Sequence, residues 1–171
     1  MKKLLILGAG GYGRTVADLA CQLGCYASVA FLDDRASGPD VLGTCSDYLH
    51  FSGEDTEMYP AFGNNDARTA WLGRMQEAGI PIPSFVHPTA YVSPRATLGI
   101  GVTVLPKAVV NTGTLVEDGC IVNIGAIVDH DVVLEKGSHI APGAIVKAEN
   151  RIPAGMKIEA GTVIENRQYP L

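Results

Sequence analysis

The chain has 171 residues, of which 47% are hydrophobic and only 18% are charged, a balance that excludes an intrinsically disordered protein. The net charge of -5 argues against nucleic acid or an acidic membrane surface as the main partner. No apolar run approaches the roughly 20 residues that cross a bilayer, so no membrane span is expected. The four cysteines form no CxxC pair, and a cytoplasmic protein with reduced thiols is therefore expected.

The first part of the chain predicts a small α/β domain. Three short apolar runs predict strands over residues 4–7, 27–32 and 58–62. Apolar residues at helical spacing follow the first run up to Gly24, and a second helix with Trp71 and Met75 on one face follows the third. The intervening residues 35–56 are expected to be mostly loop, with a short element near Val41. This order of strands and helices implies parallel strands joined by helical crossovers.

A glycine-rich segment, Gly8-Ala-Gly-Gly-Tyr-Gly13, joins the first strand to the first helix. Glycines let backbone N–H groups approach a phosphate, and Asp33 follows 20 residues after Gly13, where a carboxylate can bind a ribose or a base. The available length suits a mononucleotide or nucleotide-sugar site better than a full dinucleotide fold. The alternative is a tight turn that binds nothing.

The second part of the chain is a six-residue repeat. Every sixth residue from position 86 is a branched aliphatic: Val86, Val92, Leu98, Val104, Val110, Val116, Val122, Val128, Leu134, Ile140, Val146, Ile152, Ile158 and Ile164. Glycine follows three residues later in eight of these fourteen units, which marks a recurring corner. Three such units close a triangular coil of about 18 residues that stacks on the next coil. Only two of the aromatic residues, Tyr91 and Tyr169, lie in this part, as a narrow interior requires.

His130 and Asp131 are the candidate catalytic residues of the repeat. His130 falls at a corner and should point outward, and Asp131 occupies the position that glycine usually fills. A histidine near its ordinary pKa suits a general base, and an adjacent carboxylate can orient its ring. The alternative is a solvated corner without function. Asp129 stacks over Lys147 and is expected to form a surface ion pair with it.

The segment Asn123-Ile-Gly-Ala-Ile-Val-Asp-His-Asp131, followed by Gly137-Ser-His-Ile-Ala-Pro-Gly-Ala144, resembles the signature of the hexapeptide-repeat sugar O- and N-acyltransferases. That family includes sialic acid O-acetyltransferase and UDP-N-acetylbacillosamine N-acetyltransferase. The Gly8–Gly13 segment, Phe31-Leu-Asp-Asp34 and Gly63-Asn-Asn65 resemble the nucleotide-sugar-binding domain of the same family. The resemblance implies a Rossmann-like α/β domain over residues 1–85 and a left-handed parallel β-helix over residues 86–171.

The resemblance also implies roles for single residues. His130 matches the catalytic base, Asp131 the acidic residue that supports it, and His139 a residue that contacts acetyl-CoA. The positions that match the UDP-sugar site are Gly10, Gly11, Tyr12, Asp33, Asp34 and Gly63. The implied reaction is transfer of an acetyl group from acetyl-CoA to an amine or hydroxyl of a UDP-4-amino-sugar, without a metal, in a homotrimer.

Three alternatives stay open from the sequence. The acceptor can instead be sialic acid, with transfer to oxygen. A second alternative is a non-catalytic scaffold that binds a nucleotide sugar, which is suggested because family members usually continue beyond the point that matches Leu171. A β-helical carbonic anhydrase needs three histidines around zinc, and only His130 and His139 lie on the relevant coils.

Overall fold

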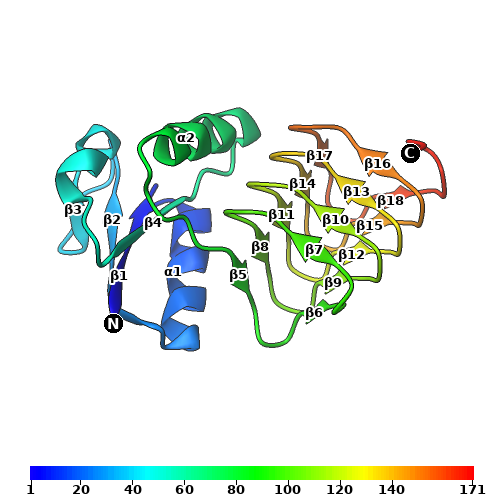
Figure 1. Cartoon of the computed structure of the whole chain (residues 1–171), viewed down its shortest axis with the longest axis horizontal. Helices are drawn as coiled ribbons and strands as arrows, with labels where there is room; N and C mark the ends of the chain where they lie inside the picture. The colour runs from blue at the N-terminus through cyan, green and yellow to red at the C-terminus, as the bar shows by residue number, and fades with distance from the viewer. The chain divides into compact units, whose positions relative to one another are not determined.

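The computed structural model describes residues 1–171 and consists of two compact units, Met1–Pro83 and Ser84–Leu171 (Figure 1). The first is an α/β unit and the second a stack of short strands. None of the helices is both long and apolar enough to span a bilayer.

The first unit is a four-stranded parallel sheet with the order β3–β2–β1–β4. Its strands are β1 (Lys2–Leu7), β2 (Tyr26–Leu32), β3 (Val41–Gly43) and β4 (Thr56–Pro60). Its helices are α1 (Gly11–Leu23), the 3-10 helix η1 (Cys45–Phe51) and α2 (Asn65–Glu77). The three predicted strands and two predicted helices are therefore present, whereas η1 replaces part of the predicted loop.

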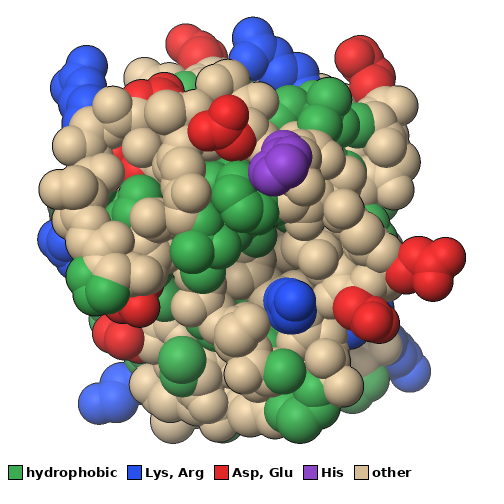
Figure 2. All heavy atoms as spheres, turned by 90° about the vertical axis from the view of Figure 1, so that its left-hand side faces the viewer, with side chains coloured by type: hydrophobic (Ala, Val, Ile, Leu, Met, Phe, Trp, Pro, Cys, Tyr) green, Lys and Arg blue, Asp and Glu red, His purple; other side chains and the backbone are tan.

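The central strand β1 is buried on both faces from Leu4 to Leu7, as its unbroken apolar run requires. On one face Leu5 packs in a cluster that includes Met75 of α2. The prediction that α2 buries Met75 is confirmed. Trp71, predicted on the same helix face, is only partly buried against the cluster and stacks on Phe62. On the molecular face shown in Figure 2, hydrophobic side chains gather near the middle, and most of the charged side chains stand around the margin.

The second unit is a left-handed parallel β-helix with three faces. The first face consists of β5 (Phe85–Val86), β8 (Thr103–Val104), β11 (Ile121–Val122), β14 (His139–Ile140) and β17 (Lys157–Ile158). The second face consists of β6 (Tyr91–Val92), β9 (Val109–Val110), β12 (Ile127–Val128), β15 (Ile145–Val146) and β18 (Val163–Ile164). The third consists of β7 (Thr97–Leu98), β10 (Leu115–Val116), β13 (Val133–Leu134) and β16 (Arg151–Ile152).

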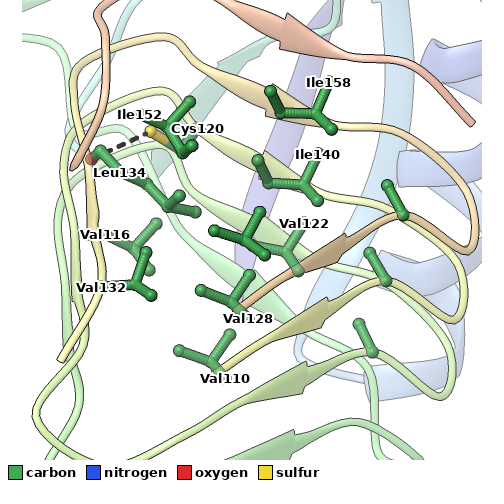
Figure 3. Packing of buried hydrophobic residues seen from close by; sticks show 14 of the residues in the cluster. Val110, Val116, Cys120, Val122, Val128, Val132, Leu134, Ile140, Ile152 and Ile158 are labelled. Atoms are coloured by element: carbon green, nitrogen blue, oxygen red, sulfur yellow. Dashed lines mark hydrogen bonds between the residues drawn. The ribbon is translucent and has the colours of Figure 1, made fainter. Parts of the chain in front are cut away.

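The six-residue repeat is the core of this unit. All fourteen aliphatic residues of the repeat are the second residue of a strand, and those from Val104 to Ile152 are fully buried. Figure 3 shows their side chains from successive coils pointing into the interior in stacked rows. Residues 18 apart pair in register, for example Val110 with Val128, so each position along a coil repeats directly above itself.

The last coil is closed by a buried asparagine. Asn150 is fully buried, and its Nδ2 donates to the carbonyl oxygens of Lys147 and Glu165, each at 2.8 Å. Its Oδ1 accepts the Tyr169 N–H at 2.8 Å, and Tyr169 packs against the end of the aliphatic core. The side chain therefore ties the final residues to the coil beneath them.

We predict that Asn150→Ala lowers the free energy of unfolding by about 2–3 kcal/mol, because several buried hydrogen bonds are lost together. Urea-induced unfolding followed by circular dichroism measures this loss. Asn166→Ala is the control, since Asn166 is an exposed asparagine in the same terminal segment. Equal unfolding midpoints for the two variants would contradict the proposed closure.

Candidate active site

His130 and Asp131 form a pair at the corner that follows β12. The ring Nδ1 lies 2.8 Å from Oδ2 of Asp131, and 45% of the His130 side chain is exposed. The carboxylate accepts the Nδ1 hydrogen, which leaves Nε2 with a free lone pair. The hydrogen bond from the ring to Asp131 raises the pKa of His130, and the nearby charges of Asp129 and Glu149 act in the same direction. The corner therefore holds a solvent-accessible base with an oriented ring.

Asp129 fixes the backbone of this corner and does not form the predicted ion pair. Its Oδ1 accepts Asn111 Nδ2 at 3.0 Å and the His130 N–H at 2.8 Å. Partial burial raises the pKa of Asp129, but these hydrogen bonds outweigh it and lower the pKa overall. Lys147 instead bonds Glu165 at 2.5 Å. The prediction was wrong because Asp129 binds Asn111, one coil below, while Lys147 binds Glu165, one coil above.

His139 forms a second polar pair with Asn123. His139 is buried on β14, and its Nε2 lies 2.9 Å from Asn123 Nδ2. The Asn123 amide is oriented by Oδ1, which accepts the Ile124 N–H at 2.8 Å, so Nδ2 is the group that donates to the ring. Because Nε2 accepts, the neutral ring carries its hydrogen on Nδ1. The ring is therefore fixed in orientation, with Nδ1 as a buried atom.

The two histidine pairs lie at opposite ends of β12. Asn123 belongs to the corner that precedes this strand, and His130 to the corner that follows it. The sequence predicted both histidines as site residues, and no interaction joins them within the β-helix. The sequence did not predict Asn123 as a partner of His139, because the two residues are 16 positions apart and only residues 18 apart stack directly on each other.

The glycine-rich segment forms a tight turn into α1. A Cβ at Gly13 would lie 1.9 Å from the Gly8 carbonyl oxygen, so this glycine is required by the protein's own packing. A Cβ at Gly10 or Gly11 would meet nothing within 4 Å. Gly10 is the N-cap of α1 without a side-chain cap, and the first turn holds no acidic residue. The exposed helix end thus leaves N–H groups and space for an anionic ligand.

Asp33 ties this turn to the end of β2. Its Oδ2 accepts the Ala9 N–H at 2.7 Å, and its Oδ1 accepts the N–H groups of Arg35 and Ala36 at 2.8 and 2.7 Å. The hydrogen bonds from Ala36 and Ala9 lower the pKa of Asp33, which stays ionised. Asp34 accepts the Cys45 N–H at 2.9 Å and so orients η1. Both predicted aspartates therefore shape the loops around the turn.

Tyr12 and Gly63 complete the predicted residues of this edge. The Tyr12 hydroxyl lies 2.8 Å from the hydroxyl of Tyr59, a buried residue of β4. Gly63 follows β4, is exposed, and has open space at its Cβ position. The turn, Asp33 and Gly63 all follow the carboxyl ends of parallel strands, the edge where ligands of α/β sheets bind. The structure therefore gathers these predicted residues at one edge of the sheet.

No three His, Cys, Asp or Glu side chains are grouped in a way that would hold a metal ion. Cys45 and Cys120 are buried, and burial raises the pKa of the Cys45 thiol to about 12. The buried thiols of Cys45 and Cys120 are therefore not candidate nucleophiles.

Comparison with known proteins gives a family match in the first unit and structural matches that span both units. Residues 3–75 match the family described as PglD N-terminal domain. The acetyltransferase domain of PglB from Neisseria gonorrhoeae FA1090 is 38% identical, with a TM-score of 0.95 over 98% of this chain and 84% of that chain. The same domain in complex with acetyl coenzyme A gives 39% identity and a TM-score of 0.94 over 97% of this chain and 83% of that chain.

A more distant structure shares the fold. A mutant of perosamine N-acetyltransferase from Caulobacter crescentus, in complex with CoA and GDP-perosamine, is 22% identical, with a TM-score of 0.76 over 95% of this chain and 91% of that chain. The identity and coverage of the Neisseria domain, together with the aliphatic repeat and the arrangement of both units, show that this chain belongs to the hexapeptide-repeat sugar acyltransferases and is an acyltransferase.

Proposed function

We propose that the protein transfers an acetyl group from acetyl-CoA to an amine or hydroxyl of a nucleotide-linked sugar, and that a UDP-4-amino-sugar is the acceptor. The observation that carries this proposal is the His130–Asp131 pair, a solvent-accessible base held at 2.8 Å by a carboxylate. The Neisseria relative that binds acetyl coenzyme A supports the choice of donor. The unobstructed backbone at Gly10 and Gly11 supports an acceptor that carries phosphates.

The reaction is a direct transfer. His130 Nε2 takes a proton from the acceptor amine or hydroxyl while that group forms a bond to the carbonyl carbon of the thioester. The C–S bond then breaks, and the CoA thiolate leaves and takes up the proton that His130 gives back, which regenerates the base. Asp131 stabilises the imidazolium that forms at His130. His139, whose ring is held by Asn123, is proposed as a contact of acetyl-CoA.

The acceptor site is proposed at the glycine turn. The pyrophosphate would lie at Gly10 and Gly11, where a backbone approach is unobstructed. Asp33 Oδ2 accepts one backbone hydrogen bond, so it keeps capacity for a ribose or base donor. Tyr12, Asp34 and Gly63 line the same edge and are proposed as further acceptor contacts.

We further propose that the protein is a homotrimer that associates through the second face of the β-helix. The outward side chains of that face are all apolar: Tyr91, Val109, Ile127, Ile145 and Val163. Tyr91, Ile127 and Val163 are exposed, and such a continuous apolar strip is typical of a surface that another protein covers. The face separates the two histidine pairs, so a neighbouring copy would bring His139 of one subunit toward His130 of another.

The central prediction concerns His130. His130→Ala should lower kcat by about 10²- to 10⁴-fold, because general-base catalysis contributes that much. Release of free thiol from acetyl-CoA, with a UDP-4-amino-sugar as acceptor, measures the rate. In the wild type, activity should fall as the pH is lowered through the raised pKa of His130, because the base is then protonated. Asp131→Asn removes the main cause of the raised pKa and should move this acid limb to lower pH.

Exposed His50, on the first unit, provides the control His50→Ala, which should keep wild-type activity. Acceptor specificity is read from a panel of UDP- and GDP-linked amino sugars and sialic acid. Thiol release that needs no acceptor, or full activity in His130→Ala, would argue against this mechanism. Binding of a nucleotide sugar without transfer to any acceptor would favour the scaffold instead.

A second prediction separates the glycines of the turn. Gly11→Ala should weaken nucleotide-sugar binding while leaving the thermal unfolding temperature unchanged, because its Cβ meets no protein atom. Gly13→Ala should lower the unfolding temperature, because its Cβ overlaps the Gly8 carbonyl oxygen. Calorimetric titration and thermal scanning measure the two effects. Unchanged binding in Gly11→Ala would move the acceptor site away from this turn.

A third prediction concerns assembly. Ile127→Glu places a charge in the middle of the apolar face and should convert trimers to monomers and reduce activity, as measured by sedimentation and thiol release. Leu115→Glu is a matched control, because Leu115 points outward from the third face and is 37% exposed against 39% for Ile127. A wild-type protein that sediments as a monomer, or an Ile127→Glu protein that stays a trimer, would contradict the proposed interface.

A further inference from the structure

The three corners of the β-helix differ in the residues that adopt a left-handed backbone. The column at the corner after the third face holds glycine in every coil: Gly101, Gly119, Gly137 and Gly155. The column after the first face holds Lys107, Gly125, Gly143 and Gly161. The column after the second face holds Gly113, Asp131, Glu149 and Arg167, with φ between +55° and +70°.

Three of the four non-glycine residues with positive φ therefore lie in one column, beside His130. The backbone of a non-glycine residue is strained in this left-handed conformation, and such strain is typical of functional sites. Within the column, Gly113 is the remaining glycine, and it lies one coil below Asp131.

The space above Gly113 is filled by the Asp131 carboxylate. An ideal Cβ at Gly113 would lie 2.3 Å from Asp131 Oδ1 and 3.4 Å from its Cγ, far closer than a real Cβ can approach. The other oxygen, Oδ2, is the one that lies 2.8 Å from His130 Nδ1. Oδ1 of Asp131 thus lies against Gly113, and Oδ2 binds the His130 ring. The carboxylate therefore stands in the space that a side chain at position 113 would occupy.

Other charged residues of the same column lie near His130. Glu149 occupies the same position in the next coil, and its carboxylate forms an ion pair with Arg167. The Glu149 N–H donates to the His130 carbonyl oxygen at 3.4 Å. The charged groups that act on His130 are thus Asp131, Asp129 and Glu149, with Arg167 bound to the last. A Cβ at position 113 would therefore displace the Asp131 carboxylate from the place where it meets the ring.

We propose that Gly113 is a positioning residue of the site, because its missing side chain leaves the space in which the Asp131 carboxylate stands beside the His130 ring. For its effect on activity this proposal rests on the proposed function, in which His130 is the general base. For its effect on the ring it rests on geometry alone.

The test is Gly113→Ala compared with Gly161→Ala. The two glycines have φ of +70° and +69°, so alanine carries the same backbone penalty at both, but a Cβ at Gly161 meets nothing within 4 Å. Gly113→Ala should lower kcat by about 10- to 100-fold and move the NMR titration midpoint of the His130 ring downward. Gly161→Ala should leave both at the wild-type value. A wild-type titration of His130 in Gly113→Ala would overturn the proposal.

A double-mutant cycle separates this effect from a general loss of fold. Asp131→Gly removes the carboxylate and relieves its strained backbone, so Gly113→Ala should add little to the rate loss in that background. An undiminished further loss would show that Gly113 acts through the backbone and would overturn the proposal. If Gly113→Ala does not fold, Gly113→Asn replaces it with the same outcomes, because asparagine adopts the left-handed backbone more readily.

The two proposals fail in different ways. If His130→Ala keeps full activity, the proposed base is wrong, yet the NMR titration of His130 still decides whether Gly113 positions Asp131. If His130→Ala is inactive and the titration in Gly113→Ala is unchanged, the base stands and the role of Gly113 is wrong.

Discussion

The stacking of one branched aliphatic side chain on the next, every sixth residue, is the interaction on which the second unit depends. A single coil cannot bury its aliphatic residues, but fourteen of them aligned in three rows form a continuous interior from Val86 to Ile164. Burying one such side chain contributes about 1.5–3 kcal/mol, so the rows together offset the entropy of ordering many two-residue strands. The rigid prism that results holds each corner at a fixed position along its axis. The polar side chains at those corners therefore start from fixed backbone positions.

The corner that bears His130 carries a cost that the others avoid. A non-glycine residue in the left-handed region costs about 1–2 kcal/mol, and Asp131, Glu149 and Arg167 occupy that region in consecutive coils. The core on which they stand is deep enough to tolerate this cost. In return, the column places the Asp131 carboxylate beside the His130 ring and pairs the Glu149 carboxylate with Arg167. A column of glycines could not supply these side chains.

The periodic parts of the structure could be predicted from the sequence. The fourteen strand positions follow from a strict period, and the three strands and two helices of the first unit follow from apolar runs such as Leu4 to Leu7. The η1 helix escaped prediction because a seven-residue 3-10 helix has no apolar period, and its signal was the capping box of Thr44 and Asp47.

Side-chain partners were less predictable than positions. Stacking arithmetic places Asp129 over Lys147, but the choice of Asn111 as partner depends on side-chain length and direction, which the period does not encode. Asn123 lies in the corner after β11, whereas His139 lies in β14, the strand that stacks on β11 in the next coil. The two residues are therefore 16 positions apart, and a search for residues 18 apart does not find the pair. The pairing of Asp131 with His130 was predictable because the two are adjacent in the chain.

The 18-residue register also limits how this site can change in evolution. Duplication or loss of a whole coil leaves every remaining residue on its own face, because the pairing of Val110 with Val128 repeats the same orientation. Gain or loss of a single six-residue unit preserves the aliphatic interior equally well, yet rotates all later corners by one third of a turn. Such a change before Asp129 would carry His130 to a different edge of the prism while the core stayed intact. Selection on the core alone therefore cannot keep His130 on its edge of the β-helix, and a separate constraint must act on the number of six-residue units that precede it.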